Sequence, residues 1–118
     1  MSADKQIVTE VSGFYPLFEV LIEHYGNIIT PGVFGIAWRY CQMPDGVCKA
    51  SLRTIAERIG LDDVTVMRHL KVLCDDDYLK DLTPGLRNKP HVYADTGRVG
   101  MISKLTASVR SSLLPSLL

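Results

Sequence analysis

Apolar residues recur at steps of three and four from Phe14 onward, and this spacing is typical of one face of a helix. The pattern predicts a helix over residues 14–25, with Pro16 in its first turn, where the missing backbone N–H costs nothing. Gly26 directly follows the last apolar position, as a C-terminal glycine often does. Residues 1–13 are polar and mixed, so we expect a flexible N-terminal arm ahead of this helix.

A second apolar stripe of helical period follows the first. Thr30 would cap this helix, and Pro31 would occupy its first position. The helix should run to about Gln42, because the turn sequence Met-Pro-Asp-Gly at residues 43–46 stops it. The aromatic residues that we expect in the core, rather than stacked on bases, are Phe14, Phe18 and Trp38.

Two helices joined by a tight turn are predicted next. Ser51 is a good N-cap, and the apolar positions after it predict a two-turn helix that ends at Gly60. Asp62 can cap the following helix, whose apolar positions continue to about Asp75. Gly60 would supply a positive φ angle that strains most other residues.

The hydrophobic period then changes from helical to alternating. Residues 78–82 alternate as a half-buried strand does, and residues 91–95 are interpreted as the returning strand. Thr83-Pro84-Gly85 is a turn signal, and the connection carries Arg87, Asn88 and Lys89. The pattern therefore predicts a β-hairpin with a basic tip.

Residues 99–118 are expected to form a C-terminal helix or tail, which Pro115 should end. Its apolar face could pair with the same face of a second chain, giving a homodimer through residues 99–114. It could equally fold back on its own domain near Phe14 and Trp38, and the sequence leaves both alternatives open. The apolar positions of this face are Ile102, Leu105, Val109 and Leu113.

The stretch of residues 51–73, SLRTIAERIGLDDVTVMRHLKVL, carries the most specific pattern in the chain. It resembles the winged helix-turn-helix superfamily, and the hairpin follows at the expected distance. The resemblance implies a fold that is mainly α with a small β-hairpin wing, over residues 14–98. The residues that carry it are Ile55, Ala56, Ile59, Gly60, Leu61, Thr65, Val66, Arg68, Leu70 and Leu73.

The chain departs from this superfamily at one place, just before the first wing strand. Many relatives have glycine where this chain has Asp77, and an aspartate adopts the left-handed conformation less easily. Asp75, Asp76 and Asp77 also put negative charge at a helix C-terminus, which is electrostatically unfavourable.

The resemblance implies contact with double-stranded DNA through a recognition helix at about 62–75 and a basic wing at about 79–95. Arg68 would read guanine, and Thr65 would contact a phosphate or a thymine methyl group. Lys71 and Arg53 would contact phosphates. The full candidate set is Arg53, Asp63, Val64, Thr65, Met67, Arg68, Lys71, Arg87, Asn88, Lys89 and His91.

The charge balance does not by itself support DNA binding. The 118 residues include 13 basic and 13 acidic side chains, for a net charge of zero. Most of the basic residues lie between residues 49 and 98, around the motif. Asp62 and Asp63 count against DNA contact, although Asp62 would be partly satisfied as a cap. Arg68 has no acid three or four positions away, which favours a free guanidinium over a local ion pair.

Three functions compete on these observations. The first is a sequence-specific, DNA-binding regulator of transcription, as in small bacterial repressors of the superfamily. The second is the DNA-binding module of a phage or plasmid replication initiator, whose N-terminal domains the lead-in to the motif resembles. The third is a winged helix used for protein–protein assembly without DNA contact, which the neutral net charge favours.

Enzymatic and metal-binding roles find no support in the sequence, and no cofactor is expected. It contains no Gly-rich phosphate loop and no G-x-S-x-G or H-E-x-x-H pattern. Its three cysteines and three histidines show no close spacing of a zinc site. We expect His69 to be a packing residue and His24 to lie on the surface. A sparse, odd set of cysteines and no apolar run of membrane-spanning length predict a cytoplasmic protein.

Overall fold

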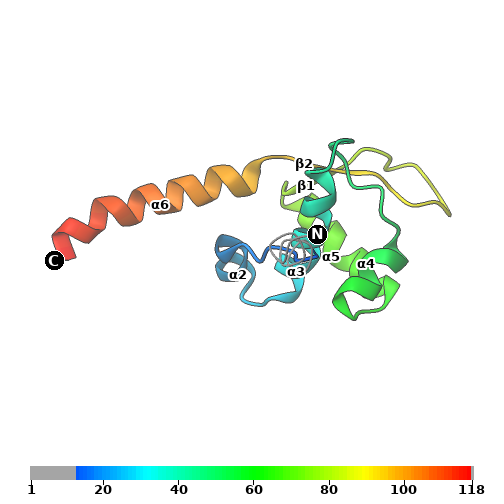
Figure 1. Ribbon diagram of the computed structural model, residues 1–118, viewed down its shortest axis with the longest axis horizontal. Helices are drawn as coiled ribbons and strands as arrows, with labels where there is room; N and C mark the ends of the chain where they lie inside the picture. The colour runs from blue at the N-terminus through cyan, green and yellow to red at the C-terminus, as the bar shows by residue number, and fades with distance from the viewer. Residues whose placement is uncertain (1–12, 118) are drawn as a thin grey trace, which may run out of the picture.

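The computed structural model describes the backbone of residues 13–117, and the side chains as far as residue 109. Its described part is mainly helical with one small hairpin (Figure 1). The predicted winged helix-turn-helix is confirmed, because a helical pair joined by a tight turn is followed by the hairpin. The expected N-terminal arm lies outside the described residues except for Gly13. The elements are α2 (Glu19–Tyr25), α3 (Ile29–Cys41), α4 (Leu52–Ile59), α5 (Asp63–Asp75), β1 (Leu79–Asp81), β2 (Tyr93–Asp95) and α6 (Arg98–Leu117).

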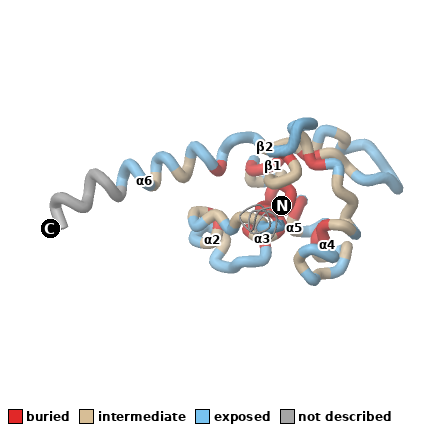
Figure 2. The backbone as a smooth tube through the Cα atoms, viewed as in Figure 1, coloured by how far each residue is buried: buried red, intermediate tan, exposed pale blue. Residues whose placement is uncertain are grey.

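Helix α3 is the centre of the core. It contacts α2, α4, α5 and β2, and its residues from Thr30 to Ala37 are mostly buried (Figure 2). Phe34 is fully buried and meets the ring of Tyr78 at a centroid distance of 6.1 Å. Helices α4 and α5 add Ile55 and Leu70 to the same core. Burial of these side chains fixes how α5 is oriented, and so which of its faces is left outward.

The turn between α4 and α5 forms as the sequence predicts. The Ser51 hydroxyl accepts a hydrogen bond from the backbone N–H of Thr54 at 3.1 Å, which caps α4. Gly60 has a φ of 75°, in the left-handed region. Asp62 accepts from the backbone N–H of Thr65 at 2.7 Å and caps α5. These donations also hold the pKa of the Asp62 carboxyl below its usual range.

The end of α5 is closed by an aspartate in the position where relatives have glycine. Asp77 has a φ of 62°, so it takes the left-handed conformation. The N–H of Tyr78 reaches the carbonyl of Leu73 at 2.9 Å, and that of Asp77 reaches Cys74 at 3.1 Å. This pair of bonds is the Schellman motif, which satisfies carbonyls that the helix end leaves open. The acidic run therefore does not prevent the wing from forming.

The wing strands are shorter than the alternating pattern predicts. Strands β1 and β2 are antiparallel, with Leu79 opposite Asp95 and Asp81 opposite Tyr93. Tyr78 lies before β1, where the N–H that would start the strand is used to close α5. The hairpin is also joined to the α3–α4 loop, because Cys48 and Tyr93 exchange backbone hydrogen bonds at 2.7 and 2.9 Å.

The predicted first helix starts too early. Helix α2 begins at Glu19 rather than at residue 14, and Pro16 lies in the extended segment before it. The carbonyl of Pro16 lies directly against Gly35 of α3, which a side chain at that position would block. This packing holds the segment extended against α3, whereas the apolar spacing alone favours a helix.

Phe14 is also placed differently from the prediction. It is 62% exposed, its ring lies under the Arg39 guanidinium, and its carbonyl accepts a hydrogen bond from Arg39 at 2.8 Å. Phe18 and Trp38 do pack against the core, with their ring centroids 5.1 Å apart. The prediction of an aromatic core is therefore confirmed for Phe18 and Trp38 and wrong for Phe14.

Thr30 does not cap α3. The side chain of Asn27 accepts from the N–H groups of Ile29 and Thr30 at 2.9 and 3.1 Å, so it satisfies the helix start instead. Thr30 is buried, and its hydroxyl is hydrogen-bonded to Nδ1 of His69 at 2.8 Å. His69 thus joins α5 to α3, as expected of a packing residue.

Helix α6 extends away from the rest of the chain (Figure 1). Only its first turns belong to the domain, where Val99 is buried and Ile102 packs on the core. Leu105 and Val109 are exposed, so the expectation that this face folds back near Phe14 and Trp38 is wrong for them. The side chain of Leu113 lies outside the described residues.

The helix also continues beyond Pro115, which was predicted to end it. A proline removes one hydrogen bond and disturbs the turn before it, but it need not end a helix that is already formed on its N-terminal side. None of the described helices combines the length and hydropathy that crossing a bilayer requires.

Candidate nucleic-acid interface

The outward face of α5 is free, because the opposite face is anchored in the core. Val66, Leu70 and Leu73 are buried, so the opposite side of the helix, with Met67, Arg68 and Lys71, points outward. Val64 and Met67 are 53% and 49% exposed, so this face presents apolar as well as charged side chains. The other predicted contacts of this face are Thr65, half-buried, and Arg68 and Lys71, both exposed.

Asp63 has a partner that the sequence pattern did not predict. The Nε atom of Arg53 lies 3.5 Å from its carboxylate, and the pair is largely solvent-exposed. The turn at Gly60 brings the start of α4 beside the start of α5, so residues ten positions apart meet. This ion pair compensates the negative charge of Asp63, which the sequence alone counts against DNA contact.

A groove of about 650 Å³ lies between the two helices and the hairpin. Arg53 comes from α4, Met67 and Lys71 come from α5, and the wing supplies Asn88 and Lys89. The structure therefore brings residues of α4, α5 and the wing to one groove. Arg68, Thr65, Val64 and Arg87 of the predicted set do not line it.

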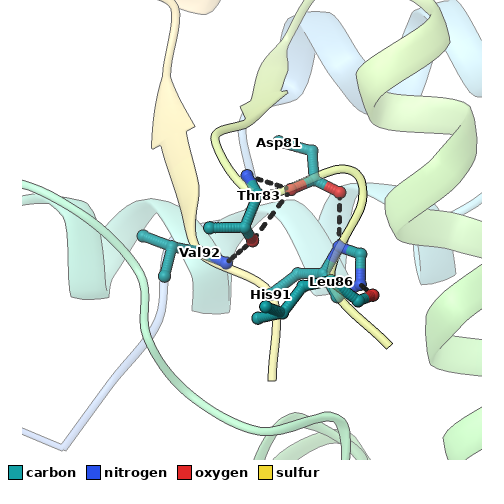
Figure 3. Close-up of polar contacts among 5 residues, drawn as sticks. All are labelled: Asp81, Thr83, Leu86, His91 and Val92. Carbon is teal, nitrogen blue, oxygen red and sulfur yellow. Dashed lines mark hydrogen bonds and ion pairs between the residues drawn. The ribbon is translucent and has the colours of Figure 1, made fainter. Parts of the chain in front are cut away.

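The wing is held in shape by hydrogen bonds at its base (Figure 3). One oxygen of Asp81 accepts from the backbone N–H of Thr83 at 2.8 Å, and the other lies 2.6 Å from Nδ1 of His91. The hydroxyl of Thr83 accepts from the N–H of Val92 at 3.0 Å, across the hairpin. Nε2 of His91 lies 2.8 Å from the carbonyl oxygen of Leu86. These contacts connect the end of β1 and the residues just before β2 to the loop between them.

His91 lines the groove, and it also belongs to the hydrogen-bond network of the wing itself. It was predicted as a DNA contact within the basic wing, but both ring nitrogens are engaged inside the wing itself. The hydrogen bond to Asp81 is the largest of the effects that raise the pKa of His91. The exposed tip beyond it carries the predicted residues Arg87, Asn88 and Lys89, and Asn88 has a φ of 58°.

Sequence reasoning missed Asp81 and Thr83 as organisers of the wing. The signal that could have found them is local, since an aspartate often accepts a hydrogen bond from the N–H two residues later in a turn. The pattern Asp81-Leu82-Thr83 fits this arrangement. Among the residues that the structure describes, no three His, Cys, Asp or Glu side chains gather where a metal ion could bind.

Comparison with known proteins adds little. No protein-family model matches the sequence, and no curated protein matches it. Among solved structures, the chain is similar to a MarR family regulator from Neisseria meningitidis, with a TM-score of 0.47 and 13% identity. The alignment covers 99% of this chain and 78% of that chain. Because the TM-score and the sequence identity are low, the functional assignment below depends on the chain's own residues.

Proposed function

We propose that this protein binds double-stranded DNA through α5 and the wing and acts as a regulator of transcription. The observation that carries the proposal is the single groove that residues of α4, α5 and the hairpin line together. A helix with a free outward face fits the major groove, and a basic tip beside it can follow the phosphate backbone.

Each part of the interface has a distinct task under this proposal. Arg68 and Thr65, on the exposed side of α5, contact base edges or phosphates in the major groove. Lys71 and Arg53 neutralise phosphates on either side of the helix, and the wing tip contacts the backbone or the minor groove. The pairing of Arg53 with Asp63 keeps a carboxylate near the DNA from acting as an isolated charge.

We further propose that two copies pair through α6. Met101, Leu105 and Val109 repeat at intervals of four residues, and all three are more than half exposed. Such a stripe is self-complementary about a two-fold axis, which would give a dimer with two recognition helices. A dimer of this kind would bind two half-sites of a palindrome.

The first test of this function is the affinity of the purified protein for labelled duplex DNA, measured by anisotropy at two salt concentrations. Arg68→Ala should weaken binding by roughly tenfold or more, because a bidentate contact to guanine is lost. Lys71→Ala should instead weaken binding to all sequences and reduce the salt slope by about one. Lys104→Ala on α6 removes the same charge far from the groove, and it should leave the affinity unchanged.

Absence of binding at low salt would contradict DNA recognition and favour the alternative of a protein–protein module. The exposed Val64 and Met67 on α5 are the observation that supports that alternative. The other alternative, the DNA-binding module of a replication initiator, uses the same interface. Selection of the preferred duplex would distinguish it, since sites in promoters support regulation and repeated sites at an origin support replication.

A further inference from the structure

The ring of His91 lies between two groups that can only accept hydrogen bonds. Nδ1 is 2.6 Å from a carboxylate oxygen of Asp81, and Nε2 is 2.8 Å from the carbonyl oxygen of Leu86 (Figure 3). A neutral imidazole carries one N–H, so it could donate to only one of them. The imidazolium carries two and satisfies both. The observed geometry is therefore that of a charged histidine.

The charged ring links the loop between the two wing strands to β1. Asp81 is the last residue of β1, and its second oxygen holds the turn at Thr83. Leu86 lies directly before the basic tip at residues 87–89. Its carbonyl is anchored through His91, while its N–H donates to the carbonyl of Thr83 at 3.0 Å. The residue that leads into the tip is thus held by the His91 ring and by the turn at Thr83.

We propose that His91, in its charged form, is the positioning residue of the wing, and that loss of its proton releases the tip and weakens DNA binding. The effect on DNA binding depends on the proposed function, whereas the release of the tip does not. On deprotonation, one nitrogen presents a lone pair to an oxygen that also has only lone pairs, and the contact becomes repulsive. The bond to Asp81 favours retention of the proton on Nδ1, so the contact to Leu86 is the one that is lost.

The surroundings of His91 carry charges of both signs. Asp81 is in direct contact and stabilises the imidazolium, and the ring of Tyr93 stacks beside it at a centroid distance of 6.3 Å. The other charged or titratable side chains that line the groove with His91 are Arg53 from α4, Asp63, Lys71 and Cys74 from α5, and Lys89 from the wing. The basic members oppose a charge on His91, but Asp81 is much nearer, and the pKa of His91 is raised.

The direction of the pH dependence follows from this shift. Because the pKa is higher in the folded wing than in an unfolded chain, the bond network is complete at pH values below the unfolded pKa. It is lost as the pH rises through the higher, folded value. Bound phosphate would favour the charged form further, so the affinity for DNA should fall by up to about tenfold per pH unit above that value.

The decisive experiment is an NMR titration of the full chain between about pH 5 and 9, with all three histidine rings observed. We expect His91 to keep both ring protons to a higher pH in the wild type than in Asp81→Asn, which can still form the turn at Thr83. The backbone amides of residues 86–89 should shift with the midpoint of His91. The proposal is overturned if His91 is neutral at low pH, or if it titrates while these amides stay unchanged.

DNA affinity is then measured across the same pH range for the wild type, His91→Gln and His24→Gln. His24 is an exposed residue of α2, so its replacement is a matched control. The wild type and His24→Gln should lose affinity together as pH rises, while His91→Gln should be weak and nearly insensitive to pH. An unchanged pH profile in His91→Gln would overturn the link to DNA. Absence of DNA binding at every pH would contradict the proposed function alone, because the NMR titration decides the wing.

Discussion

Single residues at the ends of α5 decide whether the wing can start where it does. Asp77 takes a left-handed conformation that costs most residues free energy, and glycine would take it without strain. Its neighbour Asp76 accepts a hydrogen bond from the Tyr25 hydroxyl at 2.6 Å. Burial, followed by this bond, raises the pKa of Tyr25. The acidic run is thus partly used to join the helix end to α2.

Replacement of Asp77 by glycine should stabilise the protein. Removal of the backbone strain at this position should raise the free energy of unfolding by about 0.5–1 kcal/mol, measured by urea denaturation. Asp75→Gly is the matched control, because it also removes one charge but lies within α5. It should change stability by no more than a few tenths of a kcal/mol, because glycine favours a helix only slightly less than aspartate and the loss of an unfavourable charge at the helix end offsets this. Equal effects of the two variants would mean that charge, not conformation, governs this helix end.

Residues whose roles are local could be predicted from the sequence. Ser51, Gly60 and Asp62 act through bonds or angles within a few positions, and each is confirmed. Thr30 was misassigned because its hydroxyl is taken by His69, which is distant in the sequence. The pairing of Arg53 with Asp63 was missed for the same reason. Local preference cannot identify a partner that only the packing of two helices supplies.

At the scale of elements, the position of α2 depends on close backbone contact with α3. Gly35 lies against the carbonyl of Pro16, while Gly32, one turn earlier, faces the end of the Ile59 side chain. The first neighbour is rigid backbone, and the second is a flexible side-chain terminus. Apolar spacing predicts a helix from residue 14. The contact between Pro16 and Gly35 instead favours the extended segment that the structure has there.

Substitution of these two glycines by alanine should have opposite effects on stability. Both changes favour the helix by about 1 kcal/mol through intrinsic propensity. In Gly35→Ala the new methyl group must displace the segment around Pro16, and overpacking of this kind costs about 1–3 kcal/mol. Gly32→Ala should be neutral or stabilising, since Ile59 can rotate away. Thermal unfolding of both variants checks this, and a stabilised Gly35→Ala would show that the segment is not fixed by that contact.

At the candidate interface, too, local features could be predicted and contacts between distant residues could not. The outward face of α5 follows from helical period alone, so the exposure of Arg68 and Lys71 could be expected from the sequence. The wing is different, because Asp81 ends β1 and His91 lies in the connection before β2, so the two meet only when the hairpin has formed. Their contact could not be read from either strand separately.

At the scale of the whole molecule, the chain has two unlike parts. The winged helix encloses its own core, whereas α6 leaves it after two turns and exposes an apolar stripe. Arg98 anchors the start of α6, with its guanidinium 5.0 Å from the ring centre of Tyr78. The domain therefore sets the position of the start of α6. The apolar side chains farther along the helix, Leu105 and Val109, stay exposed.

Charge placed in this stripe should prevent self-association. Leu105→Lys should convert a dimer to a monomer in sedimentation experiments, because a buried charge would be left without a partner. Ala107→Lys, on another face of the same helix, adds the same charge and should remain dimeric. If the wild type is a monomer at all concentrations tested, the proposed pairing through α6 is wrong.

The backbone hydrogen bonds between Cys48 and Tyr93 make the Cys48 thiol a reporter of wing opening. Cys48 has no exposed surface, and burial raises the pKa of its thiol, so a reagent can attack it only during an opening event. The rate of labelling would thus report how often the hairpin detaches from the α3–α4 loop, in the manner of hydrogen exchange. Cys74 is half-buried and lines the groove, so its labelling would report cover by a bound ligand directly. Tight binding of any ligand across the groove should lower the labelling rate of Cys48.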